Sequence, residues 1–252
     1  MTFHSQHQQD LWLETNVFRG FKNGTFMDVG AHDGMSINNT LYFEKTHGWT
    51  GINIEPIKDV FNRLVSNRPS CINLNLAVSS QEGTAEFVMN RGYTEMISGL
   101  KSQYDPRHLE RLKHELAAYG GSSEIVLTTT KRIDTICGEN GITHIHYLSI
   151  DVEGAEFDVV QSINFDNVFV DVIGFENNYG DTSVPIVEYL KSKGYVVIRN
   201  DFDIFMIHQG SQFNNFSVNI KPRPRLLIHR LRMRRAERSA LAFRVGHFAS
   251  SA

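Results

Sequence analysis

Acidic and small residues gather in two short stretches of the sequence, and each stretch includes or follows an apolar run. The first is FMDVGAHDG, residues 26–34, in which an aspartate is followed by two glycines with three residues between them. The second is DVEGAE, residues 151–156, which holds three carboxylates in six positions. Carboxylates can accept a proton, bind a divalent metal or attract a cationic ligand, so both stretches are candidate sites.

The elements that must position these stretches alternate along the chain. Strand-like apolar runs are expected at 25–30, 51–56, 71–78, 144–151 and 169–177. Helical patterns are expected between and after them, at 36–48, 58–68, 155–163 and 183–194. We expect Ser36 to cap the first helix and Gly48 to end it. This alternation predicts an α/β fold with a parallel sheet and right-handed crossovers.

The alternation is broken at two places. Residues 83–90 and 124–130 look like extra strands, and the segment 91–121 between them, with a helical pattern from Asp105, is expected to cover the sheet edge as a lid. Near the end, 195–200 and 202–209 are strands joined by a very short turn, which requires antiparallel pairing. A Rossmann-like, mostly parallel sheet with a C-terminal antiparallel hairpin is typical of class I methyltransferases that use S-adenosylmethionine (SAM).

Ligands of an open parallel sheet bind beyond the carboxyl ends of its strands, so the residues at the strand tips are candidate ligands. The tip residues expected to bind a cofactor are Asp28, Gly30, Ala31, Asp33, Gly34, Glu55, Asn75 and Ala77. Gly30 would let the backbone approach a ligand closely, and Glu55 could accept hydrogen bonds from both ribose hydroxyls. Charge-assisted bonds of this kind contribute about 1.5–3 kcal/mol each.

The charge pattern at these tips separates two classes of nucleotide ligand. NAD also has a ribose, but the loop lacks the G-x-G-x-x-G pattern, and Asp28 and Asp33 would repel a pyrophosphate. SAM has no phosphate and carries a sulfonium and an ammonium, which these acids favour. Simpler interpretations stay open: Asp33 as a cap or turn former, Glu55 as an exposed strand end, and His32 as an ordinary loop residue.

With these motifs in place, the chain resembles the FkbM-type SAM-dependent methyltransferases over about residues 5–209. The resemblance rests on FMDVGAHDG, SINNTLYFEKTHGWTGINIEP, NLAVSSQEGTAEF, SGL (98–100) and LSIDVEGAEFDVVQS. It implies an O-methyltransferase acting on a hydroxyl of a sugar or of a glycosylated or lipid-linked metabolite. It places Asp28 and Gly30 at the methionine end of SAM, Glu55 at the ribose and Asp151 near the acceptor. Ser149 departs from the family pattern, in which a lysine is common.

Methyl transfer to a hydroxyl needs a base, because the hydroxyl must lose its proton as the new bond forms. A positioned base contributes about 10²–10⁴-fold, and the candidates are Asp151, Glu153, His32 and Glu176. The acids Asp151, Glu153 and Glu176 could instead hold Mg²⁺. Asp151 and Glu153 could also simply cap the next helix. A non-catalytic SAM- or sugar-binding partner subunit is the alternative function, and the complete set of tip acids favours the enzyme.

The charges of the chain are divided unevenly along its length. The net charge is −3, yet nine of the 25 basic residues and only one of the 28 acids lie in 216–252. We therefore expect a methyltransferase domain at 1–215 and a basic extension at 216–252. The extension could be solvated, could pack on a partner or on the acidic body, or could contact an anionic membrane peripherally. No signal peptide pattern or membrane span is visible, so we expect a cytoplasmic protein with no nucleic-acid partner.

Overall fold

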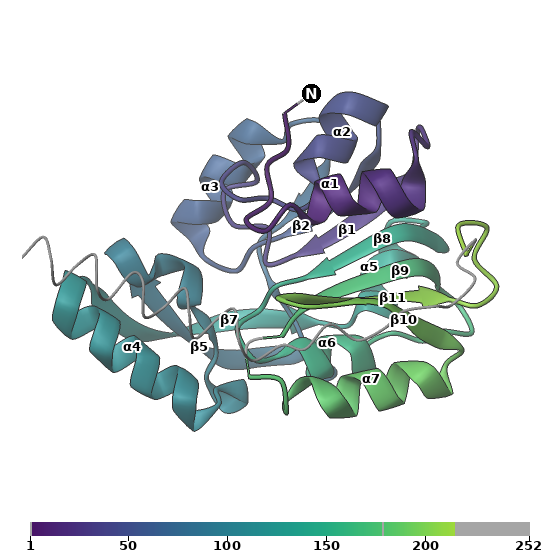
Figure 1. Cartoon of the computed structure of the whole chain (residues 1–252). Helices are drawn as coiled ribbons and strands as arrows, with labels where there is room; N and C mark the ends of the chain where they lie inside the picture. The colour runs from purple at the N-terminus through teal and green to yellow at the C-terminus, as the bar shows by residue number, and fades with distance from the viewer. Residues whose placement is uncertain (1, 178, 215–252) are drawn as a thin grey trace, which may run out of the picture. The chain divides into compact units, whose positions relative to one another are not determined.

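The computed structural model describes residues 2–177 and 179–214. The expected basic extension at 216–252 lies outside the described residues. Figure 1 shows an α/β fold in which helices lie on both sides of a central sheet. In the part of the chain that the structure describes, no helix is long and apolar enough to cross a membrane.

Within the described residues, the central sheet has seven strands in the order β10-β11-β9-β8-β1-β2-β3. They are β1 (Thr25–Val29), β2 (Thr50–Ile54), β3 (Ile72–Leu74), β8 (His144–Ile150), β9 (Phe169–Glu176), β10 (Tyr195–Asn200) and β11 (Asp203–His208). The pairs β2–β3, β1–β2, β1–β8 and β8–β9 are parallel, whereas β11 is antiparallel to both β9 and β10. This arrangement confirms the predicted mostly parallel sheet with a C-terminal antiparallel hairpin.

The helices that flank this sheet are α1 (Gln9–Leu13), which continues as a π-helical turn at Glu14–Phe18, α2 (Leu41–His47), α3 (Lys58–Asn67), α5 (Ile133–Glu139), α6 (Glu156–Gln161) and α7 (Ser183–Ser192). Those predicted at 58–68, 155–163 and 183–194 begin and end within two residues of the predicted bounds, whereas α1 and α5 were not predicted. Gly48 ends α2 with a φ of 67°, as expected. The prediction that Ser36 caps this helix is wrong, because α2 begins only at Leu41; the Ser36 hydroxyl donates to Asp33 instead.

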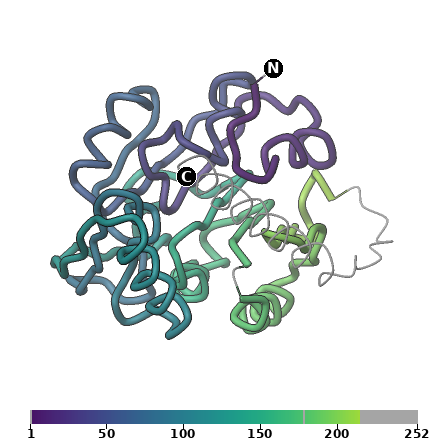
Figure 2. The backbone as a smooth tube through the Cα atoms, turned by 60° about the vertical axis from the view of Figure 1, so that its left-hand side comes forward, coloured from purple at the N-terminus to yellow at the C-terminus, as the bar shows by residue number. Residues whose placement is uncertain are grey.

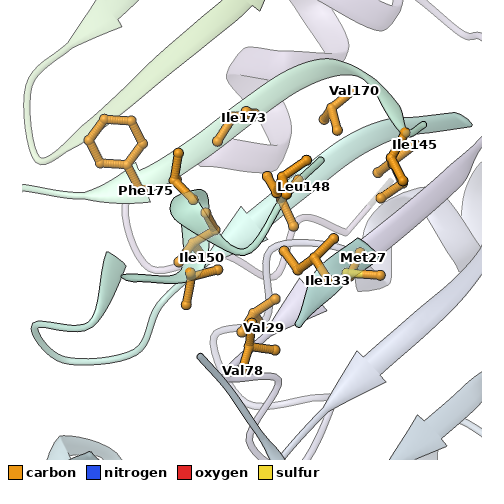
Figure 3. Packing of buried hydrophobic residues seen from close by; sticks show 14 of the residues in the cluster. Met27, Val29, Val78, Ile133, Ile145, Leu148, Ile150, Val170, Ile173 and Phe175 are labelled. Carbon is orange, nitrogen blue, oxygen red and sulfur yellow. The ribbon is translucent and has the colours of Figure 1, made fainter. Parts of the chain in front are cut away.

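Two apolar clusters hold the layers together, one on each face of the sheet. On one face, residues of β1, β8 and β9 pack against α5, α6 and α7, with Leu148, Ile173 and Ile133 fully buried (Figure 3). On the other face, an aromatic cluster around Phe18, Phe43 and other residues of the N-terminal segment and α2 covers the sheet. Burial on both faces explains why the parallel strands are almost continuously apolar in the sequence.

The strand predicted at 71–78 is two strands that belong to different sheets. β3 ends at Leu74, and the Asn75 side chain donates to the backbone oxygens of Glu55 and Pro56, where the chain leaves the central sheet. The following residues form β4 (Ala77–Val78), which pairs with β7 (Ser122–Lys131). The apolar run of eight residues is therefore divided into two strands at the point where the Asn75 side chain bonds the turn after β2.

A second sheet carries the insertion, in the order β4-β7-β5-β6. Its remaining elements are β5 (Gly83–Arg91), a 3₁₀ turn at Gly92–Ile97, β6 (Gly99–Leu100), a 3₁₀ turn at Lys101–Gln103 and α4 (Pro106–Tyr119). The predicted extra strands and helix are present, and Asp105 caps α4 by accepting from the Arg107 N–H. Figures 1 and 2 both place this unit at the end of the central sheet away from β10 and α7.

Candidate active site

The strand register aligns the carboxyl-end residues of the central sheet in one row. Ile54 of β2 pairs with Val29 of β1, Val29 with Ile150 of β8, and Ile150 with Phe175 of β9. The residues that directly follow these four positions are Glu55, Gly30, Asp151 and Glu176. Asp203 of β11 pairs with Glu176 and extends the row. The sheet therefore presents a glycine and four carboxyl groups side by side at the edge where ligands of such sheets bind.

A cavity of about 210 Å³ opens at this edge. The loops after β1, β2 and β8 line it, together with residues 76–78 around β4, Phe87 of β5, the segment 95–100 of the insertion and Arg111 of α4. Of the predicted site residues, the cavity is lined by Asp28, Gly30, Ala31, His32, Glu55, Ala77, Asp151, Glu153 and Glu176. Residues that are far apart in the sequence thus meet around one space.

Gly30 is needed at this edge for a reason other than the predicted approach to a ligand. It has a φ of 86°, and a Cβ there would lie 1.8 Å from the backbone oxygen of Asp151. Its N–H and that of Ala31 both donate to the Ile54 oxygen, so the loop after β1 bends sharply between β2 and β8. The close approach that Gly30 permits in the structure is to the protein backbone.

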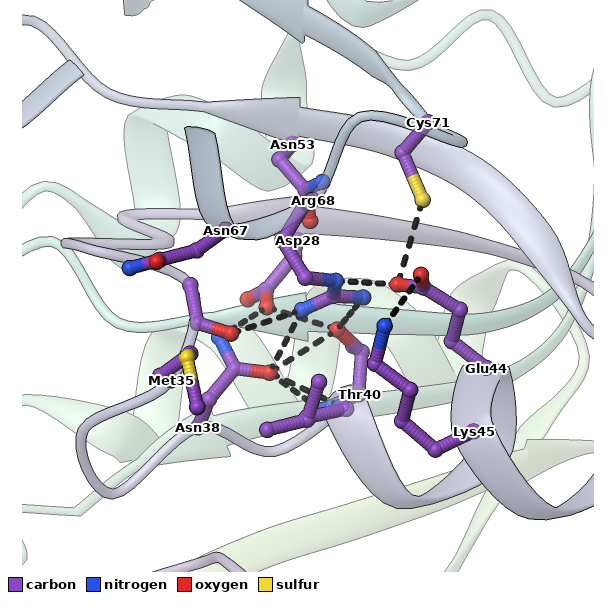
Figure 4. Close-up of polar contacts among 12 residues, drawn as sticks. Asp28, Met35, Asn38, Thr40, Glu44, Lys45, Asn53, Asn67, Arg68 and Cys71 are labelled. Atoms are coloured by element: carbon purple, nitrogen blue, oxygen red, sulfur yellow. Dashed lines mark hydrogen bonds and ion pairs between the residues drawn. The ribbon is translucent and has the colours of Figure 1, made fainter. Parts of the chain in front are cut away.

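Asp28 lies at the centre of a buried polar network (Figure 4). Its Oδ2 accepts hydrogen bonds from Asn38 Nδ2 and the Thr40 hydroxyl, each 2.9 Å long. Arg68, which is fully buried, donates to Asn38 and Thr40 and pairs with Glu44. Burial raises the pKa of Asp28, while Arg68 and the hydrogen bonds oppose that rise. The network fixes the carboxyl group under the cavity and ties α2 and α3 to β1.

Glu55 occupies the tip of β2 as predicted, and its side chain is turned back to the protein. Its Oε1 accepts from the Ile57 N–H at 2.7 Å. Burial raises the pKa of Glu55 to about 7, against the lowering effect of hydrogen bonds from the Ile57 and His32 backbones. Near neutral pH, the free protein therefore holds this carboxyl group partly protonated, so a ligand that hydrogen-bonds to the carboxylate would displace a proton.

Asp151, Glu153 and Glu176 form an acid cluster on the wall of the cavity. One oxygen of each lies within 4.8 Å of the others. Glu153 has a φ of 55°, in the left-handed region, and among the described residues its Oε2 has no hydrogen-bond partner. Arg111 Nη1 lies 3.8 Å and His108 Nδ1 lies 3.5 Å from that oxygen, and because burial lowers the pKa of His108, the positive charge that faces Glu153 comes from Arg111. The strained turn and the arginine hold three acids close together.

The protonation of this cluster is shifted strongly. The Asp151 side chain is exposed to the inside of the cavity, and protein surrounds this cavity. Because the carboxyl group is thereby removed from bulk water, its pKa is raised well above the ordinary value. Burial likewise raises the pKa of Glu153, and Glu176 raises both further, while Arg111 lowers both. Closely spaced acids of this kind share protons as a group, so their protonation steps belong to the cluster and not to one residue.

The donor set of the acid cluster also fits a divalent cation. Three carboxylate oxygens, one of them without a partner, suit Mg²⁺, and Arg111 is a competing positive charge. A second group of potential ligands, His144, His146 and Asp171, lies where β8 and β9 begin. There the Thr25 N–H donates to Nδ1 of His146, so the neutral ring keeps its proton on Nε2, which disfavours metal binding by that nitrogen.

His32 connects the cavity floor to the insertion. Its Nε2 lies 3.0 Å from Oε1 of Glu95, which also accepts from Arg63, and its Nδ1 lies 3.6 Å from Asp33. The ring is thus engaged between the loop after β1 and the 3₁₀ turn that covers the cavity. Its contacts indicate a role in holding the wall of the cavity, and its predicted catalytic role remains a prediction.

The structure does not bring three of the predicted cofactor ligands, Asp33, Gly34 and Asn75, to the cavity lining. Asp33 accepts from the Met35 and Ser36 N–H groups, so it forms a turn. A Cβ at Gly34 would lie 2.5 Å from Leu64, so this glycine serves packing against α3. Tyr93 of the insertion packs against Tyr119, with ring centroids 4.2 Å apart, and neither residue lines the cavity.

Several lining residues had no recognisable signal in the sequence. Asn38, Glu95 and Arg111 reach the cavity through a loop, a 3₁₀ turn and a helix whose positions depend on tertiary packing. The quoted SGL stretch, 98–100, lines the cavity as well, and Gly99 packs against Tyr104 and the Val152 backbone. Only the resemblance singled out that stretch, because no periodicity or charge pattern marks it.

The strand order, the antiparallel β11 between β9 and β10, and an acid-lined cavity at the carboxyl edge define a class I methyltransferase fold. The model of the Methyltransferase FkbM domain matches residues 28–197, and the chain belongs to this family of methyltransferases. The matched region begins at Asp28 and includes every residue of the predicted site.

Two solved structures resemble the chain only distantly. One is methyltransferase FkbM from Methylobacillus flagellatus KT, at 11% identity and a TM-score of 0.46, covering 75% of this chain and 44% of that one. The other is described as a "putative rRNA-methylase" from Clostridium thermocellum, at 8% identity and a TM-score of 0.44, covering 82% of this chain and 98% of that one. The chain thus spans less than half the length of the first. No curated protein matches it significantly.

Proposed function

We propose that the protein is a SAM-dependent O-methyltransferase that acts on a hydroxyl of a sugar or of a glycosylated or lipid-linked metabolite. The observation that carries the proposal is that three carboxyl groups of the row at the sheet edge, Glu55, Asp151 and Glu176, line one cavity together with Asp28. Such a lining favours the sulfonium and ammonium of SAM and disfavours a pyrophosphate. The sugar acceptor follows from the FkbM resemblance.

The residues that would hold SAM lie on both sides of Gly30. Glu55 would accept hydrogen bonds from the ribose hydroxyls, and Asp28 would attract the ammonium of the methionine end. Ala31 and Ala77 line the same space with small side chains. When bound, SAM would supply an electrophilic methyl group, and the protein must then orient the acceptor and take its proton.

The acid cluster is suited to that second task. The base should have a pKa near the working pH, and burial together with mutual repulsion raises the pKa of Asp151 and of Glu153. Asp151 is the better placed of the two, because it is open to the cavity while Glu153 faces Arg111 and His108. The neighbouring carboxyl groups would bind further hydroxyls of a sugar ring. If Mg²⁺ binds, the same three acids would hold it.

The test is transfer of labelled methyl groups from SAM to sugar nucleotides, lipid-linked sugars and deglycosylated natural products, with and without EDTA. Asp151→Asn and Glu153→Gln should retain SAM binding and lose about 10²–10⁴-fold in turnover. Glu139→Gln, an exposed acid of α5 that pairs with Lys131, is the matched control. If both site variants turn over at the wild-type rate, the base is His32 or Glu176 instead. SAM binding without transfer to any hydroxyl would favour the partner-subunit alternative.

A further inference from the structure

The second sheet has an edge that is open over most of its length. β7 pairs with β5 along its entire length, from Ser122 to Lys131. On its other side, in the described part of the chain, β7 pairs with β4 at Thr130 and Lys131 only. From Ser122 to Thr128 this side therefore has no strand partner among the described residues. Such an edge offers a row of backbone N–H and C=O groups to another strand.

The side chains along this edge are exposed and largely apolar. Leu127 is 74% exposed and Ile125 is 53% exposed, and both lie on one face because they are two residues apart in a strand. Residues 125–130, IVLTTT, contain no charge, no proline and no glycine. Proteins usually protect an open edge with a lysine, a proline or a bulge, and the β5–β7 register is regular throughout. This edge therefore has the composition of a strand that pairs on both sides.

The backbone groups that point out of the sheet at this edge belong to Ser123, Ile125 and Leu127. The Lys131 oxygen accepts from the Ser79 N–H at 3.1 Å, so the backbone groups of Lys131 point to the β4 side. The direction of these groups alternates along a strand, and every second residue before Lys131 therefore points to the same side. The residues between them bond to β5 instead.

We propose that two copies of the chain form a dimer in which their β7 strands pair antiparallel about a twofold axis at Ile125. Ile125 then exchanges both backbone hydrogen bonds with the partner's Ile125, and Ser123 does so with the partner's Leu127. On the exposed face, the two Ile125 side chains meet at the axis, with a Leu127 diagonal to each. The second sheets of the two copies become one continuous sheet. This inference does not depend on methyl transfer.

The residues around the axis select this register among the twofold alternatives. With the axis at Glu124, two glutamates would lie directly opposite each other, which is destabilising. With the axis at Val126, the partner strand would reach Thr130, where β4 already pairs. With the axis at Ile125, Glu124 lies opposite Val126. Glu124 is also paired with Arg91 of its own copy at 3.4 Å, so its charge is balanced before the copies meet.

The start of β7 keeps the partner strand clear of β4. Gly120 and Gly121 come directly before Ser122 and have φ values of 73° and 113°, so the chain changes direction there. In the proposed register Ser122 lies opposite the partner's Thr128, and the strand ends before it reaches Thr130. The edge is thus complementary to itself in length, in charge and in the direction of its backbone groups, which identifies the partner as a second copy of the chain.

The first experiment measures the mass of the full chain by sedimentation velocity over a range of concentrations. One strand pair is a small interface, so we expect a dimer with a dissociation constant of about 1–100 μM. Leu127→Lys should raise this constant about a hundredfold, because both copies lose an apolar contact. Val184→Lys on α7, which is 56% exposed, is the matched control and should leave it unchanged. A full chain that stays monomeric up to about 1 mM overturns the inference.

The second experiment tests the backbone bonds with proline. The Ile125 N–H points to the open edge, so Ile125→Pro removes a bond of the dimer and none to β5. This variant should be monomeric and should unfold in urea at nearly the same concentration as the wild type. Val126→Pro, whose N–H points to β5, should lose stability instead. A dimer that persists in both Ile125→Pro and Leu127→Lys overturns the inference.

The third experiment tests the register with a short bismaleimide. Ile125→Cys places two thiols about 5 Å apart at the axis, so it should be crosslinked. In Thr129→Cys the two thiols lie about 25 Å apart and should not be joined. Cys71 and Cys137 are present in both variants and serve as the internal control. Crosslinking of Thr129→Cys without Ile125→Cys overturns the register, and loss of the Ile125→Cys crosslink on deletion of 216–252 would show that the extension joins the copies instead.

Discussion

Gly30, which directly follows β1, and Asp151, which directly follows β8, approach so closely that the backbone oxygen of Asp151 occupies the space of a Cβ at position 30. The Asp151 N–H donates to the Val29 oxygen at 2.9 Å, so the two strand tips are joined immediately before they diverge. This contact sets the distance between the side of the cavity that contains Glu55 and the side that contains the acid cluster.

Gly30→Ala should destabilise the protein by more than about 3 kcal/mol or prevent folding, because it adds a backbone clash to an unfavourable φ. Gly20→Ala is the matched control: its φ of 82° is close to the 86° of Gly30, and no atom lies within 4 Å of its Cβ position. We expect the control to lose about 1–2 kcal/mol. Urea unfolding measures both, and equal losses would contradict the assignment of the clash.

SAM affinity should weaken as the pH falls below about 7, because the ribose hydroxyls need the ionised form of Glu55, whose pKa is about 7 in the free protein. Binding should therefore release a proton near neutral pH, which calorimetry in buffers of different ionisation enthalpy detects. Glu55→Gln should bind SAM more weakly and lose this part of the proton release. A proton release that is the same in Glu55→Gln and in the wild type would refute the role of Glu55.

Arg111→Met should move the acidic limb of the pH–rate profile upwards. Arg111 lowers the pKa of Asp151 and Glu153, so its removal raises both, and less carboxylate is available as a base at neutral pH. Because its side chain is 43% exposed, we expect a shift of about half to one pH unit. Arg91→Met, which breaks only exposed pairs with Asp59 and Glu124, should leave the profile in place.

Asp203→Asn should stabilise the protein at alkaline pH. The folded pKa of Asp203, about 7, lies above the ordinary 3.8, so folding is favoured most at low pH and this contribution is lost as the pH rises through 7. The advantage of the neutral asparagine should grow between pH 4 and 7 and then level off. Urea unfolding at a series of pH values measures it; a pH-independent difference would show that Asp203 is not buried as an acid. Asp166→Asn, at an exposed position, is the matched control and should leave the stability unchanged at every pH.

Removal of residues 216–252 should leave SAM affinity and turnover on a soluble acceptor unchanged. The described fold supports this expectation, because the central sheet is complete at His208 and Phe213 packs in the aromatic cluster. If the basic extension contacts anionic membranes, its deletion should reduce co-sedimentation with anionic liposomes, and salt should reduce that of the full-length protein. Loss of SAM binding on truncation would show that the extension belongs to the folded part.

Much of the central sheet could be predicted because its strands are buried on both faces, and each apolar run stops at its tip residue. Ile54, Val29 and Ile150 are followed by Glu55, Gly30 and Asp151, and parallel pairing places these three in one row. The sequence pattern therefore predicts the edge of the sheet at which the cavity opens. The antiparallel pairing of β10 and β11 could be predicted from the short turn at Asp201.

The residues that could not be predicted depend on contacts between distant segments. The position of Asp33 after a strand predicts a cofactor ligand. In the structure, its carboxylate instead accepts hydrogen bonds from two backbone N–H groups of its own turn. The break between Leu74 and Ala77 depends on the Asn75 side chain reaching the turn after β2. Arg111 is one polar residue among many on α4, and only the docking of that helix brings it to Glu153.

The cavity has walls that belong to two independent hydrogen-bond ladders. Phe87 of β5 and Leu100 of β6 lie in the second sheet, whereas the row of carboxyl groups belongs to the first. No strand is shared between the two sheets among the described residues. The wall formed by 95–100 can therefore be rebuilt by substitution without disturbing the ladder that aligns the acids. For the proposed methyltransferase activity, this independence predicts that substitutions at 95–100 can change acceptor preference while the acids stay in place.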